Sequence, residues 1–566
     1  MTQSHNNLSS TLTEALSTTS IKVISFDIFD TLLYRPFVKP QDVFKYIEVS
    51  YNAKGFSRAR KNAERRAKHI LKREVSYDEI YNVLAGKFYD IKDKEQSLER
   101  DTLKANKKVF KEYSKLKNKG YRLIATSDMY YSKAFLKEVL EDNGYFFDEI
   151  YVSNEYNRTK SGGGELYDVV LSDLKKSIPA LEPGEILHIG DNYYSDYLSA
   201  KRKKWNAIHI TTAYDDLFRE NKFLKKYYKF MHKSLAASMI VGNILKNNGL
   251  DFLYNLGYNI VSFLSLVYAS FILAESRKRK IDELLFVARD GYFIQKVMSV
   301  LLDGKNDIKL HYVYAPRKQF FLTHYVERKG GFYNLLMPKS FRNYVVDYFN
   351  IDTNGVKAYK YYKLHKDVVA EKQQEVRDEY NYQGYINGIV AGENVAIIDG
   401  ASVSLRAQKL ISMETNRNVF GFYLISFSTR LGSNRKYQTA RLVRHLYENI
   451  YFTSDISNML ERIFQSKEET ADFVNSKGEV TFRAGTTTKM RTEVYGKIED
   501  GVQDSINSFK PLLNDSILAL FNNSKLFLRL IGVFRLFDKA NFKRVESELY
   551  VEHFAEEKKE KRGNRK

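Results

Sequence analysis

The feature that most constrains the fold is a series of short apolar runs that alternate with longer helical patterns. In the first part of the chain these runs occupy residues 23–26, 123–125, 150–152, 186–189 and 207–210. Short apolar runs between helical patterns predict buried strands, and such alternation predicts a parallel sheet with helices on both faces. A second block of the same kind follows at 284–288, 310–313, 395–398 and 421–424. The sequence therefore predicts an α/β fold in two parts.

The positions of these blocks suggest how the chain divides into domains. At about 100–200 residues per domain, a chain of 566 residues is expected to form two or three. A long helical insertion at about 36–118 would cover the active site of the first domain, and Ser76 with Glu79 predicts a helix capping box inside it. The expected order is a disordered N-terminus (1–19), the first α/β domain (20–215), a linker (216–235), a second α/β domain (236–490) and a helical basic region (491–566).

Composition excludes some classes of protein. The chain has no cysteine, which rules out disulfides and thiolate metal sites and fits a reducing cytoplasm. The net charge of +21 favours attraction to phosphate groups, although a lysine-rich composition alone accounts for much of it. No nucleic-acid-binding motif accompanies the charge, so no nucleic-acid partner is expected. The N-terminus has no signal-peptide pattern, and the apolar stretch 260–273 is shorter than the ~20 residues of a membrane span. We therefore expect a cytoplasmic protein in which this stretch is a buried helix.

Polar residues gather at the ends of the strands predicted in the first domain. In an open α/β sheet, ligands bind at the carboxyl ends of the strands. Several carboxylates in one place require a cation, and Mg²⁺ prefers such hard oxygen ligands together with phosphate. A carboxylate can also attack phosphorus and form an aspartyl-phosphate. The candidate residues are Asp27, Asp30, Thr31, Ser127, Asp128, Lys160, Asp191 and Asp196.

These motifs resemble those of the haloacid-dehalogenase superfamily over about residues 20–215. The resemblance implies a Rossmann-like core and a Mg²⁺-dependent phosphatase with Asp27 as its nucleophile. It implies that Ser127 binds the phosphate and that Lys160 neutralises its charge, with Thr31 and Asp128 also in the substrate site. The metal ligands would be Asp27, the backbone carbonyl of Phe29, Asp191 and Asp196.

One position departs from the pattern of the superfamily. Its phosphatases usually carry a second Asp two residues after the nucleophile as general acid and base, and this chain has Phe29 there. The Phe29 carbonyl can still bind a metal, but its side chain cannot move a proton. Asp30 or Asp128 could replace the missing acid; if neither does, the domain is a slow or inactive phosphatase.

A second set of polar residues follows the strands of the second domain. A strand that ends in a short polar turn before a helix is a phosphate-binding geometry. An acid followed by small residues can hold ribose hydroxyls and a 5-phosphate, which is the role expected of Asp399, while Asp290 is a candidate metal ligand or base. An ordinary α/β domain with polar strand ends is the alternative. The other candidate binding residues are Arg289, Gly291, Arg317, Lys318, Gly400, Ser402 and Ser404.

The second pattern is similar to phosphoribosyltransferase-type folds, and the two halves together resemble a bacterial polysaccharide-assembly family of the capsule or O-antigen kind. The segments FDIFDTLL, SDMY, RDGYF and IIDGASVS carry this resemblance. It implies a bifunctional enzyme that transfers 5-phosphoribofuranose from phosphoribosyl pyrophosphate (PRPP) to a glycan acceptor, expected to be lipid-linked, and then removes the 5-phosphate. Arg289 and Arg317 would bind the pyrophosphate.

Two other functions also fit the sequence. The first half could be a hydrolase that acts on a small phosphorylated metabolite, with a decayed second domain, or the chain could be a catalytically dead scaffold. In the C-terminal region, residues 526–537 place apolar side chains at helical spacing among basic ones. We expect this helix to pack on the protein; the alternative is peripheral contact with the inner face of the cytoplasmic membrane.

Overall fold

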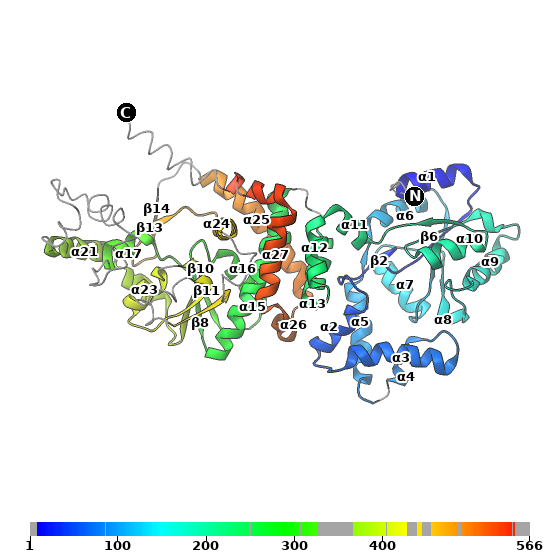
Figure 1. The fold of residues 1–566 in the computed structure, drawn as a ribbon, viewed down its shortest axis with the longest axis horizontal. Helices are drawn as coiled ribbons and strands as arrows, with labels where there is room; N and C mark the ends of the chain where they lie inside the picture. Colours follow the sequence, from blue (N-terminus) through cyan, green and yellow to red (C-terminus); the bar gives the residue numbers. More distant parts are fainter. Residues whose placement is uncertain are drawn as a thin grey trace. The chain divides into compact units, whose positions relative to one another are not determined.

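The computed structural model describes residues 8–549 apart from 85, 248, 250, 306, 325–365, 403–404, 427–437, 444–453, 484–487 and 546. The chain divides into two units. The first comprises Met1–Lys246 with Asn514–Ile517, and the second Asn247–Leu513 with Leu518–Lys566. Each unit carries a five-stranded parallel sheet together with helices, so the predicted α/β fold class is confirmed (Figure 1).

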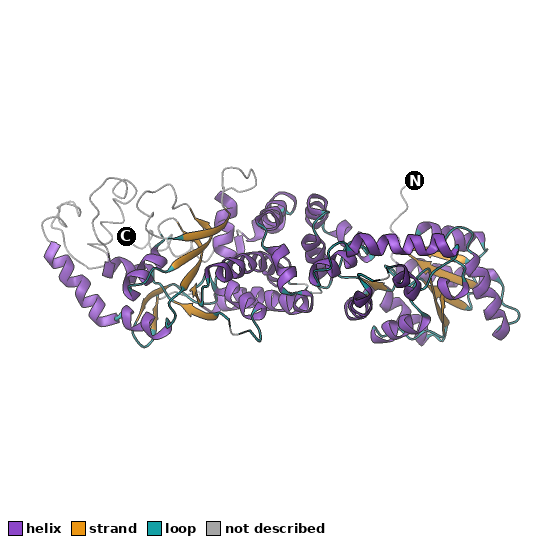
Figure 2. Ribbon diagram, turned by 90° about the horizontal axis from the view of Figure 1, so that it is seen from below, coloured by secondary structure: helices purple, strands orange, loops and turns teal. Residues whose placement is uncertain are grey.

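The sheet of the first unit has the strand order β5-β4-β1-β6-β7, and all of its strands are parallel. Each strand overlaps one of the apolar runs of the sequence. Helices lie on both faces of the sheet (Figure 2), which explains why Val23, Ile24 and Phe26 of the central strand are inaccessible to solvent. The strands are β1 (Val23–Phe26), β4 (Arg122–Ser127), β5 (Glu149–Val152), β6 (Ile186–Gly190) and β7 (Asn206–His209). The helices of this core include α1 (Leu8–Thr18), α6 (Lys107–Asn118), α7 (Lys133–Asp142), α8 (Ser153–Tyr156), α9 (Glu165–Ser177) and α10 (Ser199–Arg202).

A helical insertion leaves the sheet after β1 and returns before β4. Its two ends are joined by an antiparallel pair, β2 (Leu33–Tyr34) with β3 (Lys104–Ala105). The capping box predicted from Ser76 and Glu79 is present at the start of α4. α6 packs against β4 and α1, so residues 107–118 belong to the core and not to the cap predicted at 36–118. The helices of the insertion are α2 (Asp42–Ser50), α3 (Phe56–Leu71), α4 (Tyr77–Val83), η1 (Tyr89–Ile91) and α5 (Lys92–Thr102).

Two segments of the first unit differ from the predicted boundaries. The N-terminal stretch 1–19, expected to be disordered, contains helix α1, whose Leu12 is buried and which packs on α6. The stretch 216–235, expected to be a linker, lies in helices because apolar side chains such as Phe223 and Tyr227 find buried places in this unit. These helices are α11 (Ala213–Glu220), α12 (Lys222–Met231) and the start of α13 (Leu235–Leu245).

The sheet of the second unit has the strand order β12-β11-β10-β8-β9 and is also parallel throughout. Its strands are β8 (Glu283–Val287), β9 (Lys309–Val313), β10 (Val395–Ser402), β11 (Phe420–Ser426) and β12 (Thr439–Val443), of which the sequence did not indicate the last. A separate hairpin joins β13 (Ala471–Val474) and β14 (Val480–Phe482). The helices of this unit include α14 (Phe252–Leu256), η4 (Gly257–Val261), α15 (Ser262–Arg279), α16 (Tyr292–Leu301), α17 (Arg317–His324), α21 (Lys366–Tyr380), α22 (Tyr382–Ile389), α23 (Arg406–Thr415), α24 (Ser454–Ile463), α25 (Thr488–Phe509), η8 (Lys510–Leu512) and α27 (Ser524–Phe537). Helix α26 (Asp515–Phe521) has its first three residues in the first unit and the rest in the second.

The apolar segments of this unit are largely buried within the protein. The stretch Phe252–Arg279 is long and apolar enough to cross a membrane, but 94% of its apolar window is buried, as in the core helix of a globular domain. This agrees with the buried helix expected at 260–273. α25 packs against α14, η4, α15 and α16, so residues 491–509, predicted to begin a separate C-terminal region, are part of the helical packing of the second unit. On α27, Leu526, Leu530 and Phe534 are buried as well, whereas Leu536 and Phe537 at the end of the helix are exposed.

Candidate active site

The first sheet reverses its strand order between β1 and β6, and the candidate site lies at this switch point. Asp27 directly follows β1, and Asp191 directly follows β6. In an open α/β sheet this is where the loops diverge and leave a crevice for ligands. A cavity of about 730 Å³ opens here, with one wall from the core and one from the helical insertion. Its lining includes Asp27, Phe29, Asp30, Ser127, Asp128, Tyr130, Lys160, Asp191 and Asp196 from the core, Arg35 from the segment that leads into the insertion, and Gln41, Phe44, Glu64 and Glu99 from the insertion.

Three carboxylates form the centre of the site. One oxygen from each of Asp27, Asp191 and Asp196 lies within 4.8 Å of the other two. Burial, reinforced by the like charge of Asp196 and Asp191, raises the pKa of Asp27 well above its usual value despite the nearby ammonium of Lys160. Burial and the charge of Asp30 raise the pKa of Asp191 to about 6. A donor set of hard oxygens whose negative charge is incompletely neutralised fits Mg²⁺.

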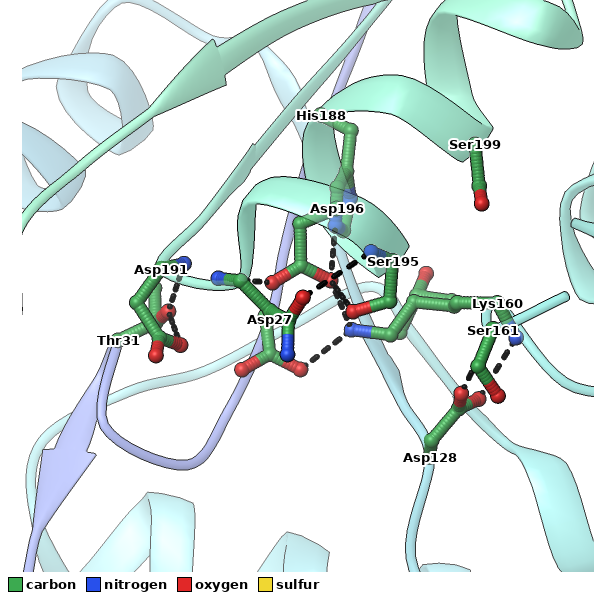
Figure 3. A network of polar contacts seen from close by, with 12 residues as sticks. Asp27, Thr31, Asp128, Lys160, Ser161, His188, Asp191, Ser195, Asp196 and Ser199 are labelled. Atoms are coloured by element: carbon green, nitrogen blue, oxygen red, sulfur yellow. Dashed lines mark hydrogen bonds and ion pairs between the residues drawn. The ribbon is translucent and has the colours of Figure 1, made fainter.

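Lys160 lies between two of these carboxylates. Its Nζ is 2.5 Å from Oδ1 of Asp27 and 2.7 Å from Oδ1 of Asp196, and its side chain is 2% exposed (Figure 3). The other oxygen of Asp196 accepts a hydrogen bond from the Asn192 N–H at 2.9 Å. Burial works against the charged form of Asp196, but the charge of Lys160 and the contacts with His188 together outweigh it and hold the pKa of Asp196 far below its usual range. Asp196 therefore stays ionised and anchors Lys160, while one oxygen of Asp27 points away from the lysine.

The local fold keeps Asp196 in place. A π-helical turn, η3 (Tyr193–Leu198), carries it, and the side chain of Asn192 caps this turn by accepting hydrogen bonds from the backbone N–H groups of Tyr194 and Ser195. The Asp196 carboxylate lies against the Cα of Gly190, so that a Cβ at Gly190 would collide with it. Glycine is therefore required there for steric reasons.

His188 lies behind the site, in the middle of β6. It is fully buried, its Nδ1 is 2.8 Å from the Ser25 hydroxyl, and its Nε2 is 3.5 Å from the Asp196 carboxylate. Burial lowers the pKa of His188, which favours the neutral ring. The histidine thus supports Asp196 from the rear and is not among the residues that line the cavity.

The other predicted residues of this site divide into two groups. Ser127 lies at the end of β4 and lines the cavity, where its hydroxyl can meet a phosphate. Thr31 instead holds Asp191: its hydroxyl donates to the Asp191 carboxylate at 3.0 Å and accepts from the Asp191 N–H at 3.1 Å. The carboxylate of Asp128 accepts the backbone N–H groups of Lys160 at 2.8 Å and Ser161 at 3.0 Å, so it fixes the loop that carries the lysine.

Arg35, which the sequence did not single out, lines the cavity beside Phe29 and Asp30. Its guanidinium stacks over the Phe29 ring at 4.5 Å and pairs with both oxygens of Glu99 at 2.9 and 3.0 Å. Asp30 lines the cavity here with a left-handed φ of 60°, and burial raises its pKa although Arg35 acts in the opposite direction. The pairing of Arg35 with Glu99 spans 64 positions, so local sequence patterns contain no signal for it.

The insertion is rigid where it borders the cavity. Arg60 is fully buried, forms an ion pair with Glu95 at 3.0 Å, and its guanidinium lies over the rings of Phe44 and Tyr130 at 4.8 and 4.7 Å. Both of these aromatic residues line the cavity. Tyr81 donates a hydrogen bond of 2.6 Å to the same Glu95. A buried ion pair therefore holds the aromatic wall opposite the carboxylates.

The second unit has a switch point of its own, between β8 and β10. Asp290 follows β8, and Asp399 lies within β10. A Cβ at Gly400 would meet the Asp290 carboxylate at 2.8 Å, which places Asp290 beside this strand. Burial and the charge of Asp399 raise the pKa of Asp290 to about 8, while Arg289 and Arg317 act in the opposite direction. Burial likewise raises the pKa of Asp399 to about 6.

The basic candidates of the second unit are partly occupied by other groups. Arg289 has a left-handed φ of 74°, and its guanidinium donates to Thr470 at 2.6 Å and Gln465 at 2.8 Å. Lys318 faces Asp472 at 3.5 Å and the ring of Phe473, whereas Arg317 is exposed at the start of α17. The structure thus brings Arg289, Arg317 and the two acids near one another and directs Lys318 elsewhere.

The phosphate loop predicted after Asp399 differs in the structure. β10 continues through Gly400 to Ser402 and pairs with β11 up to Ser402↔Ser426, because parallel pairing is available to the backbone there. Ser404 and the side chain of Ser402 lie outside the described residues. Gly291 ends the short turn before α16; its N–H donates to the Val287 carbonyl at 2.8 Å, and a Cβ would clash with that oxygen.

Comparisons with known proteins gave solved structures only. No family model matches the chain, and no curated protein matches it. A dehalogenase with an intermediate complex aligns with a TM-score of 0.26 and 15% identity over 34% of this chain and 86% of its own. A HAD family enzyme from Bacteroides thetaiotaomicron aligns with a TM-score of 0.26 and 16% identity, over 34% of this chain and 95% of its own. An L-2-haloacid dehalogenase aligns with a TM-score of 0.25 and 16% identity, over 34% of this chain and 87% of its own.

Proposed function

We propose that the first unit is a Mg²⁺-dependent phosphatase of the haloacid-dehalogenase type. The observation that carries this proposal is the meeting of Asp27, Asp191, Asp196 and Lys160 at the switch point of a parallel sheet, inside a cavity covered by a helical insertion. A buried carboxylate beside a fixed ammonium and two further acids is a suitable arrangement for phosphoryl transfer.

The described residues suggest a role for each group. A carboxylate oxygen of Asp27 attacks the phosphorus atom, the bond from phosphorus to the leaving oxygen breaks, and an aspartyl-phosphate forms; water then cleaves it to release phosphate. Lys160 and the Ser127 hydroxyl stabilise the charge on the phosphoryl oxygens. Asp27, Asp191, Asp196 and the Phe29 carbonyl are the candidates to hold Mg²⁺, which when bound would neutralise phosphoryl charge.

Proton transfer is assigned to Asp30 in this proposal. Asp128 is occupied by the two backbone N–H groups of the Lys160 loop. Asp30 lines the cavity, and burial raises its pKa. A raised pKa suits a group that gives a proton to the leaving oxygen and later takes one from water. Phe29, at the position usual for this role, packs under Arg35 instead.

Phosphate release from ribose 5-phosphate, with and without Mg²⁺, tests this proposal. Asp27→Asn should abolish turnover, and Asp30→Asn should lower kcat by about 10²–10⁴-fold, the usual contribution of general acid and base. Wild-type turnover that needs no divalent cation, or full turnover by Asp27→Asn, would refute the assignment. No release by the wild type would favour the dead scaffold.

We further propose that the second unit transfers 5-phosphoribofuranose from PRPP to a glycan acceptor, expected to be lipid-linked, and that the first unit then removes the 5-phosphate. The observation in favour is a second parallel sheet whose switch point carries Asp290 and Asp399, with Arg289 and Arg317 nearby. In this scheme Asp399 binds the ribose hydroxyls and Asp290 binds metal or activates the acceptor hydroxyl.

Labelled PRPP with candidate glycan acceptors tests the second activity. The Asp27→Asn variant should accumulate a phosphorylated glycan, whereas the wild type should release a ribofuranosyl glycan and phosphate. Asp399→Ala and Asp290→Ala should each reduce transfer. If PRPP is not consumed while ribose 5-phosphate is hydrolysed, the chain is a hydrolase of small phosphorylated metabolites.

A further inference from the structure

The cavity of the first unit is larger than its phosphate chemistry requires. About 730 Å³ falls within the range of about 300–1,000 Å³ typical of pockets for drug-sized ligands. A phosphoryl group and the Mg²⁺ ligands occupy only the end near Asp27 and Asp191. The lining continues beyond Lys160 to Ser161, Gly162 and Arg202, which leaves space for the leaving group of a substrate.

That surface has an unusual composition on the core side. It is formed by Ser161 and Gly162 of the glycine-rich loop after Lys160, by Tyr194 and Ser195 of η3, and by Ser199 and Arg202 of α10. We call these six residues the rim. In Figure 3, Ser161, Ser195 and Ser199 lie on the same side as Lys160, while Asp191 and Thr31 lie on the other. The rim therefore lies on the Lys160 side of the carboxylates, where the Ser195 hydroxyl is 3.4 Å from the Asp196 carboxylate.

Tyr194 is the most informative residue of the rim. Its side chain is 75% exposed although it lines the cavity, a larger exposed fraction than that of any other large hydrophobic residue in the described part of the chain. The π-helical turn places it there, and its backbone is fixed by the Asn192 cap and by the Ser199 hydroxyl, which donates to the Tyr194 carbonyl at 3.0 Å. An aromatic face held in solvent at the mouth of a polar cavity provides a flat apolar surface for a ligand ring.

The groups around Tyr194 are hydrogen-bonding groups. Gly162 leaves bare backbone at the mouth, since a Cβ there would meet no atom within 4 Å. Arg202 is exposed, and among the described residues its guanidinium has only the Gly162 carbonyl at 3.5 Å as a hydrogen-bond acceptor and no carboxylate partner. A flat aromatic ring bordered by hydroxyls, backbone and a guanidinium matches a sugar ring, which has apolar C–H faces and hydroxyl edges.

We infer that the rim is a subsite for a second sugar ring in the leaving group of the phosphatase substrate, the one linked to the sugar that carries the phosphate. The ring stacks on Tyr194, and its hydroxyls bind Arg202 and the Gly162 backbone. The inference rests on the proposed phosphatase activity and narrows its substrate to a phosphate carried by a glycan of at least two sugar units. Phe44 of the insertion and Tyr130 of the core add two aromatic rings to the lining of the cavity.

The test compares two substrates in the full-length protein with Mg²⁺: ribose 5-phosphate, and a disaccharide in which 5-phosphoribose is linked to galactose. Tyr194→Ala should lower the ratio of kcat/KM for the disaccharide to that for ribose 5-phosphate about tenfold, equivalent to about 1.4 kcal/mol. Arg202→Gln should lower the same ratio, and Tyr194→Trp should retain it. Most of the change should be in KM.

Neighbouring residues supply matched controls. Tyr193 is 43% exposed and stacks on Tyr197, and Lys201 precedes Arg202; neither lines the cavity. Tyr193→Ala and Lys201→Gln should leave kcat/KM unchanged for both substrates. An unchanged ratio in Tyr194→Ala and Arg202→Gln, with ribose 5-phosphate still hydrolysed by the wild type, would overturn the sugar subsite alone. If the wild type hydrolyses neither substrate, the proposed phosphatase itself fails.

Discussion

Replacement of Lys160 by methionine tests the electrostatic design of the site most directly. The lysine ammonium lies 2.5 Å from Asp27 and 2.7 Å from Asp196, and all three side chains are nearly inaccessible, with exposed fractions of 2%, 11% and 1%. Methionine has a similar length and fills most of the same space. The substitution therefore removes a charge while leaving packing largely intact.

The expected loss of stability follows from burial. Breaking a buried ion pair by removing one partner costs about 3–5 kcal/mol, because the remaining charge is left without compensation. Here two carboxylates lose their shared cation, so we expect Lys160→Met to lower the free energy of unfolding of the first unit by about that amount near neutral pH. Part of the loss should be recovered in the double variant Lys160→Met/Asp196→Asn, because the two positions are in contact and their effects are not additive.

The chain provides a selective readout for this unit. Trp205 is the only tryptophan, is 1% exposed, and packs on Tyr167 at 4.8 Å between ring centres in the core of the first unit. Its fluorescence in urea reports the unfolding of this unit within the full-length protein. The matched control is Lys203→Met, which removes the lysine of an ion pair with Asp168 whose side chains are 26% and 55% exposed. Such exposed pairs contribute at most about 1 kcal/mol.

Two outcomes would refute this reasoning. If Lys160→Met destabilises the first unit no more than Lys203→Met does, the lysine does not carry the neutralising charge. If Lys160→Met is strongly destabilising but the Asp196→Asn substitution deepens the loss, then packing and not uncompensated charge is the cause.

Three more predictions follow from the same geometry. The pKa of Asp191 is raised from 3.8 to about 6, so this group contributes stability that is complete below pH 4 and is lost as the pH rises through 6. The loss is about 3 kcal/mol. We expect Asp191→Asn or saturating Mg²⁺ to abolish this pH-dependent loss, measured by urea unfolding with Trp205 fluorescence at pH 4.5 and 7. Gly190→Ala should displace the Asp196 carboxylate and reduce kcat for ribose 5-phosphate by at least about tenfold, and wild-type turnover in this variant would contradict the predicted collision. Asp290, with a pKa raised to about 8, stabilises its unit only while protonated; Asp290→Asn should therefore raise the melting temperature of the second unit more at pH 9 than at pH 5 in calorimetry, and equal shifts would argue against a buried carboxyl there.

Much of the first unit was predictable because its signals are local. Buried strands of a parallel sheet must be apolar, so the runs that became β1, β4, β5, β6 and β7 stood out between helices. Acidic residues at the ends of these strands indicated where a site would form. The capping box of Ser76 and Glu79 was visible for the same reason, since both of its partners lie within one turn of helix.

Other features depended on contacts between distant residues. β12 was missed, and the loop expected after Asp399 is a strand, because pairing with β11 is decided by a neighbour and not by the residues themselves. The helix at 8–18 forms where an apolar side chain meets α6, which composition alone does not show. The membrane alternative for 526–537 was also a question of tertiary structure: most apolar side chains of that helix are buried, and Leu536 and Phe537 are exposed.

The sequence by itself determined which residues would stand at the ends of the strands, since the order of apolar runs and polar turns is written along the chain. Only the tertiary structure decided what each of them contacts. It assigned Asp196 to hold Lys160, Thr31 to hold Asp191, and Asp128 to hold the lysine loop. The physical reason is that hydrogen bonds and ion pairs act over a few ångströms in space, whereas these partners are separated by up to 160 positions in the chain.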